Sequence, residues 1–375
     1  MNRVGLNLVW MVPGTVGGSE SYLTRLLNGL AERSSELDFT AFALPSFADA
    51  HPTLCRAFRV VYAPVSGNSK ALRVAGENSW LAYECRRRRL NLVHHGGGIL
   101  PLVRWGTSLI TVHDLQYLSY PDYFSPTKLQ YLKRMVPRST RIARLILTPS
   151  EFTRLAVIER MHVDPHAVRV IPHGIAPVLG GDATEDARAR YALTGPFFLY
   201  PAITYPHKNH LVLLDAFAAV LKDHPDLALV LTGGRGPAEA AVFRRVQTLG
   251  IETQVKRLGY ISEGDLNSLY LEAIAMTFPS RYEGFGAPVL EAMARGCPVI
   301  AADAAALPEV VGPAGRLVAP DDVEGWAGAM KELIVDAQVR GPLAAAGLER
   351  ARHFTVSRAA GLLEDAYRLA LGRTP

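Results

Sequence analysis

Short, almost continuous apolar runs alternate with longer amphipathic segments along the first half of the chain. The run 4–12 (VGLNLVWMV) precedes the segment 19–34 (SESYLTRLLNGLAERS), whose apolar residues recur at helical spacing. The later apolar runs of this half are 38–44, 58–64, 91–95, 108–114, 144–150 and 167–174. Strands without polar alternation are typical of a parallel sheet that helices cover on both faces. The pattern therefore predicts an α/β unit.

The alternation stops at residues 173–196, which are rich in glycine, alanine and charge, and resumes after them. We interpret this stretch as a linker with a short helix. The strands expected beyond it are 196–203, 227–233, 255–260, 275–280, 298–303 and 315–320. Open α/β sheets bind ligands at the carboxyl ends of their strands, so two such sheets predict a ligand site in the cleft between them.

We therefore expect an α/β protein with two Rossmann-like parallel-sheet domains and an interdomain cleft. The first domain is assigned to residues 1–178 and the second to residues 179–354, and a last helix, within 355–375, is expected to pack back on the first domain. A length of 375 residues agrees with this division, because it exceeds what one hydrophobic core usually organises.

The composition excludes several classes of protein. With 49% hydrophobic and 20% charged residues the chain is not disordered, and no apolar run reaches the roughly 18 residues that span a bilayer. Cys55, Cys85 and Cys297 are widely spaced and suggest neither a disulfide framework nor a metal site. The apolar N-terminal run lacks the features of a secretory signal. We expect a cytoplasmic protein.

The formal net charge of +5 is concentrated in two segments, 86–89 (RRRR) and 128–144. A solvated helix face accounts for such charge without any function. The alternative is attraction to an anionic membrane surface or to a phosphate-bearing acceptor, which would make the protein peripheral on the inner face of the cytoplasmic membrane. No motif for nucleic acid accompanies the charge, so no nucleic-acid partner is expected.

The glycines after the first strand do not form a dinucleotide fingerprint. Gly14, Gly17 and Gly18 lack the spacing of G-x-G-x-x-G, and no G-K-[ST] sequence occurs. The two halves must therefore bind a different ligand.

The segment 281–296 (RYEGFGAPVLEAMARG) combines two carboxylates, Glu283 and Glu291, with a Gly-Phe-Gly turn and the start of an expected helix. Pro288 near the helix start and Gly296 at its end bound that helix. Carboxylates suit vicinal hydroxyl groups, and amides at a helix start suit phosphate or sugar oxygens. From spacing alone, a second interpretation stays open, in which Glu291 only complements the helix dipole and Glu283 is solvated. The amides that would point outward belong to Gly284, Phe285, Gly286 and Ala287.

The longer segment 281–312 resembles the signature of glycosyltransferase family 4, the retaining transferases of GT-B fold. Glu283 and Glu291 meet its E-x7-E pattern, with EGFG, LEAMA-x-G and PV-x-A in register. The resemblance implies that Glu283 contacts the donor hexose near its anomeric centre and that Glu291 binds the ribose hydroxyls. It also implies that the amides of the EGFG turn hold the sugar and the diphosphate.

Three further segments extend this resemblance. GGSE, with Gly17 and Gly18, is similar to the glycine-rich loop that approaches the donor phosphate, although a helix start capped by Ser19 is the alternative. TVHDLQYLSYPDYFSP, at 111–126, resembles the His-Asp segment of mannosyltransferase-like members and places His113 on the acceptor side. Two histidines at the end of the fourth expected strand, His94 and His95, either shape the acceptor loop or form a tight strand-end turn.

YPHKN, at 205–209, resembles the P-R-K-N segment that brings basic residues to the diphosphate. Lys208 matches the pattern, whereas His207 stands where arginine is common, and Ile203 stands at another position where many members carry arginine. Lys208 would then carry more of the charge stabilisation, with Arg235 as the alternative source. The hinge-like His173 and the buried Cys297 are interpreted as structural.

The resemblance implies a retaining hexosyltransferase that uses a nucleotide-diphosphate sugar and needs no metal or other cofactor. His113, Lys208 and Glu283 are the expected catalytic residues, and the donor site adds Gly17, Gly18, His207, the EGFG–Ala287 turn and Glu291. Transfer of mannose from GDP-mannose to a saccharide or lipid-linked saccharide, in cell-envelope or exopolysaccharide synthesis, is the leading expectation. The alternatives are a UDP-hexose transferase, a nucleotide-sugar 2-epimerase and a non-catalytic nucleotide-sugar-binding partner. Nucleobase contacts are expected from 258–265.

Overall fold

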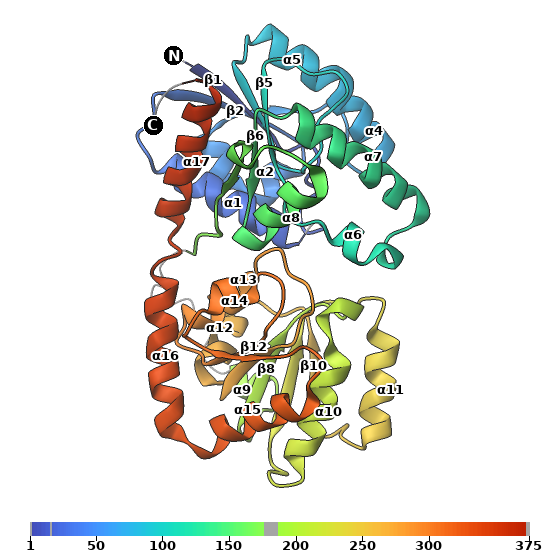
Figure 1. Ribbon diagram of the computed structural model, residues 1–375, viewed down its shortest axis with the longest axis vertical. Helices are drawn as coiled ribbons and strands as arrows, with labels where there is room; N and C mark the ends of the chain where they lie inside the picture. Colours follow the sequence, from blue (N-terminus) through green and yellow to red (C-terminus); the bar gives the residue numbers. More distant parts are fainter. Residues whose placement is uncertain (1, 16, 176–186, 373–375) are drawn as a thin grey trace. The chain divides into compact units, whose positions relative to one another are not determined.

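The computed structural model describes residues 2–15, 17–175 and 187–372, which form two compact units (Figure 1). Unit 1 comprises Met1–Gly174 and Phe354–Pro375, and unit 2 comprises Ile175–His353. The boundary predicted between residues 178 and 179 lies outside the described residues. Unit 1 is therefore discontinuous in the sequence, because its last segment follows the whole of unit 2.

Unit 1 is built on a parallel sheet of seven strands in the order β3-β2-β1-β4-β5-β6-β7. The strand order reverses between β1 and β4, and the carboxyl ends of these two strands form the switch point where such sheets bind ligands. The strands are β1 (Asn2–Asn7), β2 (Leu37–Ala43), β3 (Arg59–Tyr62), β4 (Leu92–His95), β5 (Thr107–Thr111), β6 (Leu145–Thr148) and β7 (Val168–Val170).

Helices pack on both faces of this sheet, and the core residues of β1, β4, β5 and β6 are almost wholly buried. Serine caps begin two of the helices, since Ser125 Oγ accepts from the amide of Lys128 and Ser150 Oγ accepts from that of Thr153. The helices of unit 1 are α1 (Gly18–Ala31), α2 (Phe47–Ala50), α3 (Pro52–Ala57), α4 (Lys70–Gly76), the π-helix η1 (Glu77–Leu81), α5 (Ala82–Arg87), α6 (Gln116–Ser119), the 3-10 turn η2 (Pro121–Tyr123), α7 (Pro126–Ile142), α8 (Glu151–Met161), the 3-10 turn η3 (Pro165–Ala167) and α17 (Val356–Ala370).

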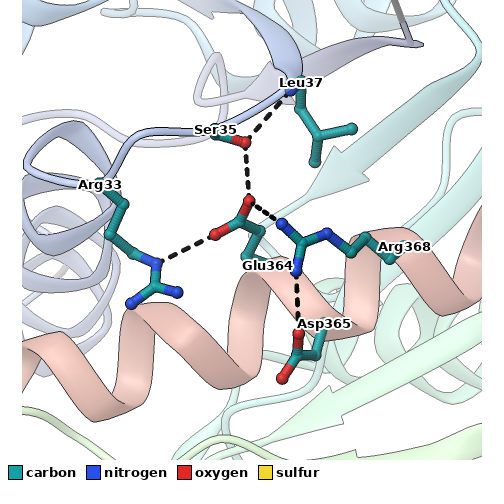
Figure 2. Close-up of polar contacts among 6 residues, drawn as sticks. All are labelled: Arg33, Ser35, Leu37, Glu364, Asp365 and Arg368. Atoms are coloured by element: carbon teal, nitrogen blue, oxygen red, sulfur yellow. Dashed lines mark hydrogen bonds and ion pairs between the residues drawn. The ribbon is translucent and has the colours of Figure 1, made fainter. Parts of the chain in front are cut away.

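The C-terminal helix α17 packs against α1 and completes the core of unit 1 (Figure 1). The two helices approach closely at Gly29, where a Cβ atom would lie 2.5 Å from the Val356 side chain. On α17 the side chains of Leu363 and Tyr367 are fully buried, and Glu364 is buried with them. Figure 2 shows the Glu364 carboxylate between the guanidinium of Arg33 and that of Arg368.

Unit 2 repeats the same architecture with a parallel sheet of six strands in the order β10-β9-β8-β11-β12-β13. Its switch point lies between β8 and β11. The strands are β8 (Phe197–Pro201), β9 (Ala228–Thr232), β10 (Val255–Gly259), β11 (Ala275–Phe278), β12 (Val299–Ala302) and β13 (Arg316–Val318). The helices are α9 (Ala187–Arg190), the 3-10 turn η4 (Pro206–Lys208), α10 (His210–Leu221), α11 (Glu239–Leu249), α12 (Glu263–Glu272), α13 (Ala287–Met293), α14 (Leu307–Val311), α15 (Val323–Val335) and α16 (Ala337–Ala351).

Every strand pair in both sheets is parallel. The prediction of two Rossmann-like parallel-sheet domains is thus confirmed. Within the described ranges, each helix is too short or too polar to cross a lipid bilayer.

Candidate active site

A lysine–glutamate pair lies at the switch point of unit 2. Lys208 ends the turn η4 that follows β8, and Glu283 lies in the loop that follows β11, the neighbouring strand. The Lys208 Nζ is 2.5 Å from the Glu283 Oε1, and the two side chains are 17% and 14% exposed. The same ammonium group lies 5.3 Å from the centroid of the buried Phe278 ring. A mostly buried charge pair is therefore held at the carboxyl edge of the sheet.

Backbone contacts fix the position of this pair. The hydroxyl of the buried Tyr200 donates to the carbonyl of Lys208, and the amide of Arg281 donates to the carbonyl of His207 at 2.8 Å. Asn209 ends the turn in the left-handed region with φ 60°, and its Nδ2 donates to the Pro320 carbonyl at 2.6 Å. Asparagine tolerates that conformation better than most residues. The loops after β8 and β11 are thus tied to each other.

The glycine-rich turn leads from Glu283 into helix α13. Gly286 precedes α13 with φ 103°, a conformation that favours glycine. A Cβ atom at this position would lie 2.6 Å from the Leu307 side chain, so both the backbone and the space require glycine. Phe285 is buried, which anchors the turn on the body of the unit. Glu291 follows on α13 itself.

A cavity of about 210 Å³ adjoins this turn at the carboxyl edge of the unit 2 sheet. Its walls are mostly apolar and include one carboxylate, that of Glu291, while Tyr260 is 78% exposed and contributes an aromatic wall. The lining residues are Pro201, Ala202, Ile203, Thr232, Gly233, Tyr260, Ile261, Leu266, Tyr270, Pro288 and Glu291. The structure thus brings Glu291 and part of the segment 258–265 to one cavity, and Ile203 lies in its wall.

Arg257 holds one wall of this cavity through its contacts with the turn after β9, and no sequence motif pointed to it. Its guanidinium donates to the carbonyls of Gly233 at 2.8 Å and Gly234 at 2.9 Å, and it pairs with Glu239 at 3.3 Å. These bonds fix the turn after β9 that lines the cavity. An arginine within a strand has no motif of its own, so only the fold reveals its contacts. Arg235, in contrast, has an 87% exposed side chain.

His207 does not replace the positive charge of the arginine that is common at its position. It is only 7% exposed and stacks on Tyr205, with ring centroids 5.6 Å apart. Burial, together with the neighbouring charge of Lys208, lowers the pKa of His207 to about 4. The imidazole is therefore neutral at pH 7, and Lys208 is the cation of this segment.

His113 lies directly after β5 in unit 1, between two aromatic rings. The ring centroids of Trp10 and Tyr22 are 6.1 Å and 5.4 Å from that of His113. The Nε2 of His113 donates to the Gly96 carbonyl at 2.8 Å, and burial lowers the pKa of His113 to about 4. The ring is thus neutral at pH 7, with its proton on Nε2 and its accepting lone pair on Nδ1.

The glycine-rich loop after β1 also lies at the carboxyl edge of the unit 1 sheet. Gly17 precedes α1 with φ 62°, and Gly18 is its first residue. A Cβ atom at either glycine would meet nothing within 4 Å, so the backbone borders open space. The helix α1 has Gly17 and not Ser19 as its N-cap, and no side chain caps it. The alternative role of Ser19 is therefore wrong.

His94 and His95, whose role was left open, are buried, and so are His173 and Cys297, which were interpreted as structural. His94 bonds to Tyr367 and Thr111, each at 2.8 Å, and His95 lies 3.1 Å from Asn7. His173 is buried against the ring of Tyr22. Burial raises the pKa of the Cys297 thiol to about 12, which keeps it protonated. In the parts of the chain that the structure covers, no three His, Cys, Asp or Glu side chains gather as a metal site would need.

The predicted site residues therefore divide between the units. His207, Lys208, Glu283, the turn from Gly284 to Ala287 and Glu291 lie together at one edge of unit 2. Gly17, Gly18 and His113 lie in unit 1, each directly after a strand or at the helix that follows it.

Comparison with known proteins identifies the class. The family model described as Glycosyl transferases group 1 matches residues 183–350, and the one described as Glycosyltransferase Family 4 matches residues 16–178. An O-antigen chain mannosyltransferase of Escherichia coli is 30% identical over 284 residues, which cover 74% of each chain. A Salmonella typhimurium O-antigen chain mannosyltransferase is 28% identical, covering 78% of this chain and 84% of its own. A D-inositol 3-phosphate glycosyltransferase of Corynebacterium diphtheriae is 28% identical, covering 94% and 90%.

Solved structures agree on the fold. A sucrose-phosphate synthase from Thermosynechococcus elongatus superposes with a TM-score of 0.78 at 22% identity, covering 99% of this chain and all of its own. An Anabaena protein solved with UDP and glucose gives a TM-score of 0.77 at 21% identity, covering 98% and 100%. The class is thus a glycosyltransferase with the GT-B fold. Within that class, the chain belongs to glycosyltransferase family 4, whose members are also described as group 1 glycosyltransferases.

Proposed function

We propose that this glycosyltransferase moves mannose from GDP-mannose, with retention at the anomeric carbon, to a saccharide or lipid-linked saccharide of a cell-envelope or extracellular glycan. The observation that carries the proposal is the Lys208–Glu283 pair, which lies at one sheet edge with the cavity that contains Glu291. A cation for the diphosphate, a carboxylate for the hexose and a carboxylate for the ribose are then present on one unit.

The cavity is the proposed nucleoside site. Its apolar walls suit the faces of a base, and the Tyr260 ring offers a stacking surface, an interaction worth about 1–3 kcal/mol per base. The Glu291 carboxylate would accept hydrogen bonds from the two ribose hydroxyls, and such bonds to a charged acceptor contribute about 1.5–3 kcal/mol each. Arg257 would keep the glycine turn of this cavity in place.

Lys208 is proposed to stabilise the departing diphosphate. As the bond between the anomeric carbon and the phosphate oxygen breaks, its electron pair stays on that oxygen, and an ammonium group lowers the energy of the developing charge. Without donor, Lys208 is held by Glu283 at 2.5 Å and needs no other counter-ion. Binding of the diphosphate would share the ammonium between two partners, while Glu283 would accept a hydrogen bond from a hexose hydroxyl.

The acceptor hydroxyl would attack the anomeric carbon from the face that the phosphate leaves. Its proton would pass to the departing phosphate oxygen, which gains negative charge as the bond breaks. His113 is a weak base for this step because its pKa is about 4. We assign it the role of accepting a hydrogen bond at Nδ1 from a sugar hydroxyl and thereby orienting the sugar.

The mannose assignment rests on two lines of support. The 111–126 segment resembles that of mannosyltransferase-like members, and two of the relatives are named as O-antigen chain mannosyltransferases. The charge of Lys208 supports a mechanism without metal. The alternatives are a UDP-hexose donor and a 2-epimerase activity, and the following experiments distinguish both from this proposal.

The donor is tested by thermal shift with GDP, UDP, ADP and dTDP and their sugars. We expect GDP and GDP-mannose to raise the transition most. A larger shift with UDP-hexoses would overturn the GDP assignment, and conversion of the donor sugar without acceptor would indicate an epimerase. Transfer in excess EDTA should be unchanged, and proton NMR of the product should show the donor's α configuration.

The roles of the pair are tested by Lys208→Met and Glu283→Gln. Each should reduce transfer at least about 100-fold, as loss of one charge-stabilising group commonly does. Because each variant leaves the partner's charge mostly buried, some loss of stability is expected, and circular dichroism must show that the variant is folded at the assay temperature. Lys208→Arg should retain part of the activity because the charge stays. The matched control is Lys222→Met, which removes an exposed lysine of the same unit at the end of α10. Near-normal turnover in Lys208→Met would refute the assignment.

A further inference from the structure

Unit 1 exposes a cluster of large apolar side chains in the loop before β5. Leu102 is 61% exposed, Val103 57% and Trp105 42%, and they occur within four consecutive residues. Single exposed apolar residues are common on soluble proteins, but several neighbouring ones usually mark a surface that another molecule covers. We refer to residues 102–105 as the apolar loop.

The fold holds the apolar loop in this exposed position. The Asn78 side chain, from the π-helix η1, accepts hydrogen bonds from the amides of Leu102 at 2.6 Å and Val103 at 3.4 Å. Gly106 then turns the chain with φ 79° close to the carbonyl of Leu90, where a Cβ atom would lie 2.9 Å away. The backbone is anchored while the side chains point to solvent, so the exposure is built into the structure.

Arginines surround the apolar loop. The Arg86 guanidinium lies 5.6 Å from the centroid of the Trp105 ring, and Arg104 is part of the loop itself. Arg144 lies in the short connection between α7 and β6, directly before β6. As far as the described residues go, none of these three exposed arginines forms an ion pair. Their charges therefore remain available to an anionic partner.

An open cavity of about 540 Å³ lies between Arg104 and Arg144. It is formed at the amino ends of β5, β6 and β7 by Gly106, Thr107, Ser108, Ile142, Ala143 and Ala167 together with the two arginines. Ser108 is one of the lining residues and is only 5% exposed, and its buried Oγ has no hydrogen-bond partner among the described residues. Buried hydroxyl groups are normally paired. The guanidinium groups of Arg104 and Arg144 suit a phosphate group, to which each can donate two hydrogen bonds.

We propose that this face of unit 1 binds the surface of an anionic phospholipid bilayer. The apolar loop enters the interfacial region, where tryptophan is preferred, and a head-group phosphate occupies the cavity between Arg104 and Arg144. A nucleic acid or a free phosphorylated sugar would use the arginines but would leave Leu102 and Val103 in water. A lipid surface is the partner that uses both the charge and the apolar side chains.

Within unit 1, the proposed lipid-binding cavity and His113 lie at opposite edges of the same sheet. The cavity is at the amino end of β5, where Thr107 begins the strand, and His113 follows its carboxyl end. Changes in the apolar loop should therefore affect lipid binding without altering the reacting groups. The inference does not depend on which sugar is transferred.

Co-sedimentation with vesicles tests the proposal on the full-length protein. The vesicles contain either phosphatidylcholine alone or phosphatidylcholine with about 30% phosphatidylglycerol, which gives them the negative surface charge of an anionic membrane. Two double variants are compared, Leu102→Ser with Val103→Ser and Arg104→Gln with Arg144→Gln. Their controls lie in unit 2: Phe243→Ser, whose side chain is 61% exposed, and Arg244→Gln with Arg352→Gln, which matches the loss of charge.

We expect the protein to sediment with the anionic vesicles only, and each loop or arginine variant to bind at least about tenfold more weakly. The controls should bind like the unchanged protein, and transfer to a short soluble acceptor should be equal in all of them. Three results would overturn the proposal: no binding to anionic vesicles at low salt, equal weakening in the matched controls, or full retention of binding in the Leu102/Val103 variant. Competition by inorganic phosphate at constant ionic strength that removes all binding would show a free phosphate site and not a membrane surface.

Discussion

Replacement of Glu364 by glutamine tests how firmly α17 is joined to the rest of unit 1. The carboxylate side chain is 1% exposed and accepts hydrogen bonds from Arg33 Nε at 3.0 Å, Ser35 Oγ at 2.8 Å and Arg368 Nη2 at 2.7 Å (Figure 2). Glutamine keeps the size of the side chain but loses the charge and one accepting oxygen.

The expected cost follows from these contacts. Removal of one partner from a fully buried ion pair commonly costs about 3–5 kcal/mol, because the remaining charge stays buried. The side chains of Arg33 and Arg368 are 36% and 35% exposed, so both guanidiniums can recover part of their hydration. We therefore expect a loss of about 2–3 kcal/mol in the free energy of unfolding of unit 1.

The loss should also depend on pH. Burial alone would raise the pKa of Glu364, but the hydrogen bonds from Arg33 and Ser35 and the charge of Arg368 hold it below its ordinary value of 4.5. A lowered pKa stabilises the folded state above the unfolded-state pKa, and this contribution disappears as the pH falls through the folded-state pKa. The difference between wild type and Glu364→Gln should thus be full at pH 7 and shrink below about pH 4.5.

Urea unfolding followed by circular dichroism at pH 7 and at several lower values measures both effects. The control is Glu349→Gln, whose carboxylate pairs with Arg352 at 2.7 Å but is 61% exposed, so its loss should cost less than about 1 kcal/mol. A Glu364→Gln variant as stable as this control, or a difference that is unchanged at low pH, would refute the argument that the buried carboxylate holds α17 in place.

Three further predictions concern the donor site of unit 2. Tyr260→Ala should weaken the binding of the nucleotide about 5- to 100-fold, as loss of a stacking ring does, with an unchanged thermal transition; a calorimetric titration that gives equal affinity would exclude the ring from the site. Gly286→Ala should lower both the melting temperature and the rate of transfer, because it adds strain of about 1–3 kcal/mol at φ 103° and crowds Leu307; a variant that melts and turns over like wild type would disprove this. Arg257→Met should raise the dissociation constant of the donor several-fold by freeing the carbonyls of Gly233 and Gly234, and this effect should be absent in the exposed control Arg244→Met.

The fold was predictable from the sequence because its signals are local. The apolar run predicted at 275–280 is β11 (Ala275–Phe278), and that at 298–303 is β12 (Val299–Ala302). Central strands of a parallel sheet are buried on both faces, so each shows a run of apolar residues whatever its neighbours are. The turn at Gly286 was predictable for the same reason, because the Gly-Phe-Gly sequence and the helix that follows it are adjacent in the chain.

The details of the site were less predictable because they depend on distant residues. Lys208 and Glu283 are 75 positions apart, and their contact exists only because β8 and β11 are adjacent in the sheet. The neutral state of His207 follows from its burial, which the sequence does not specify. The exposure of Leu102 likewise depends on Asn78, a residue with no motif of its own.

The placement of α17 has a consequence for how the protein is made. The strands of unit 1 leave the ribosome before unit 2, but the helix that supplies Tyr367 to His94 and Glu364 to Arg33 is synthesised after unit 2. At about 5–20 residues per second, the synthesis of unit 2 separates these events by roughly 10–35 s. Unit 2 can therefore fold before α17 is available to complete the core of unit 1. A chain truncated before α17 exposes the apolar residues of unit 1 that this helix covers, and proteases and chaperones can recognise such exposed apolar surface.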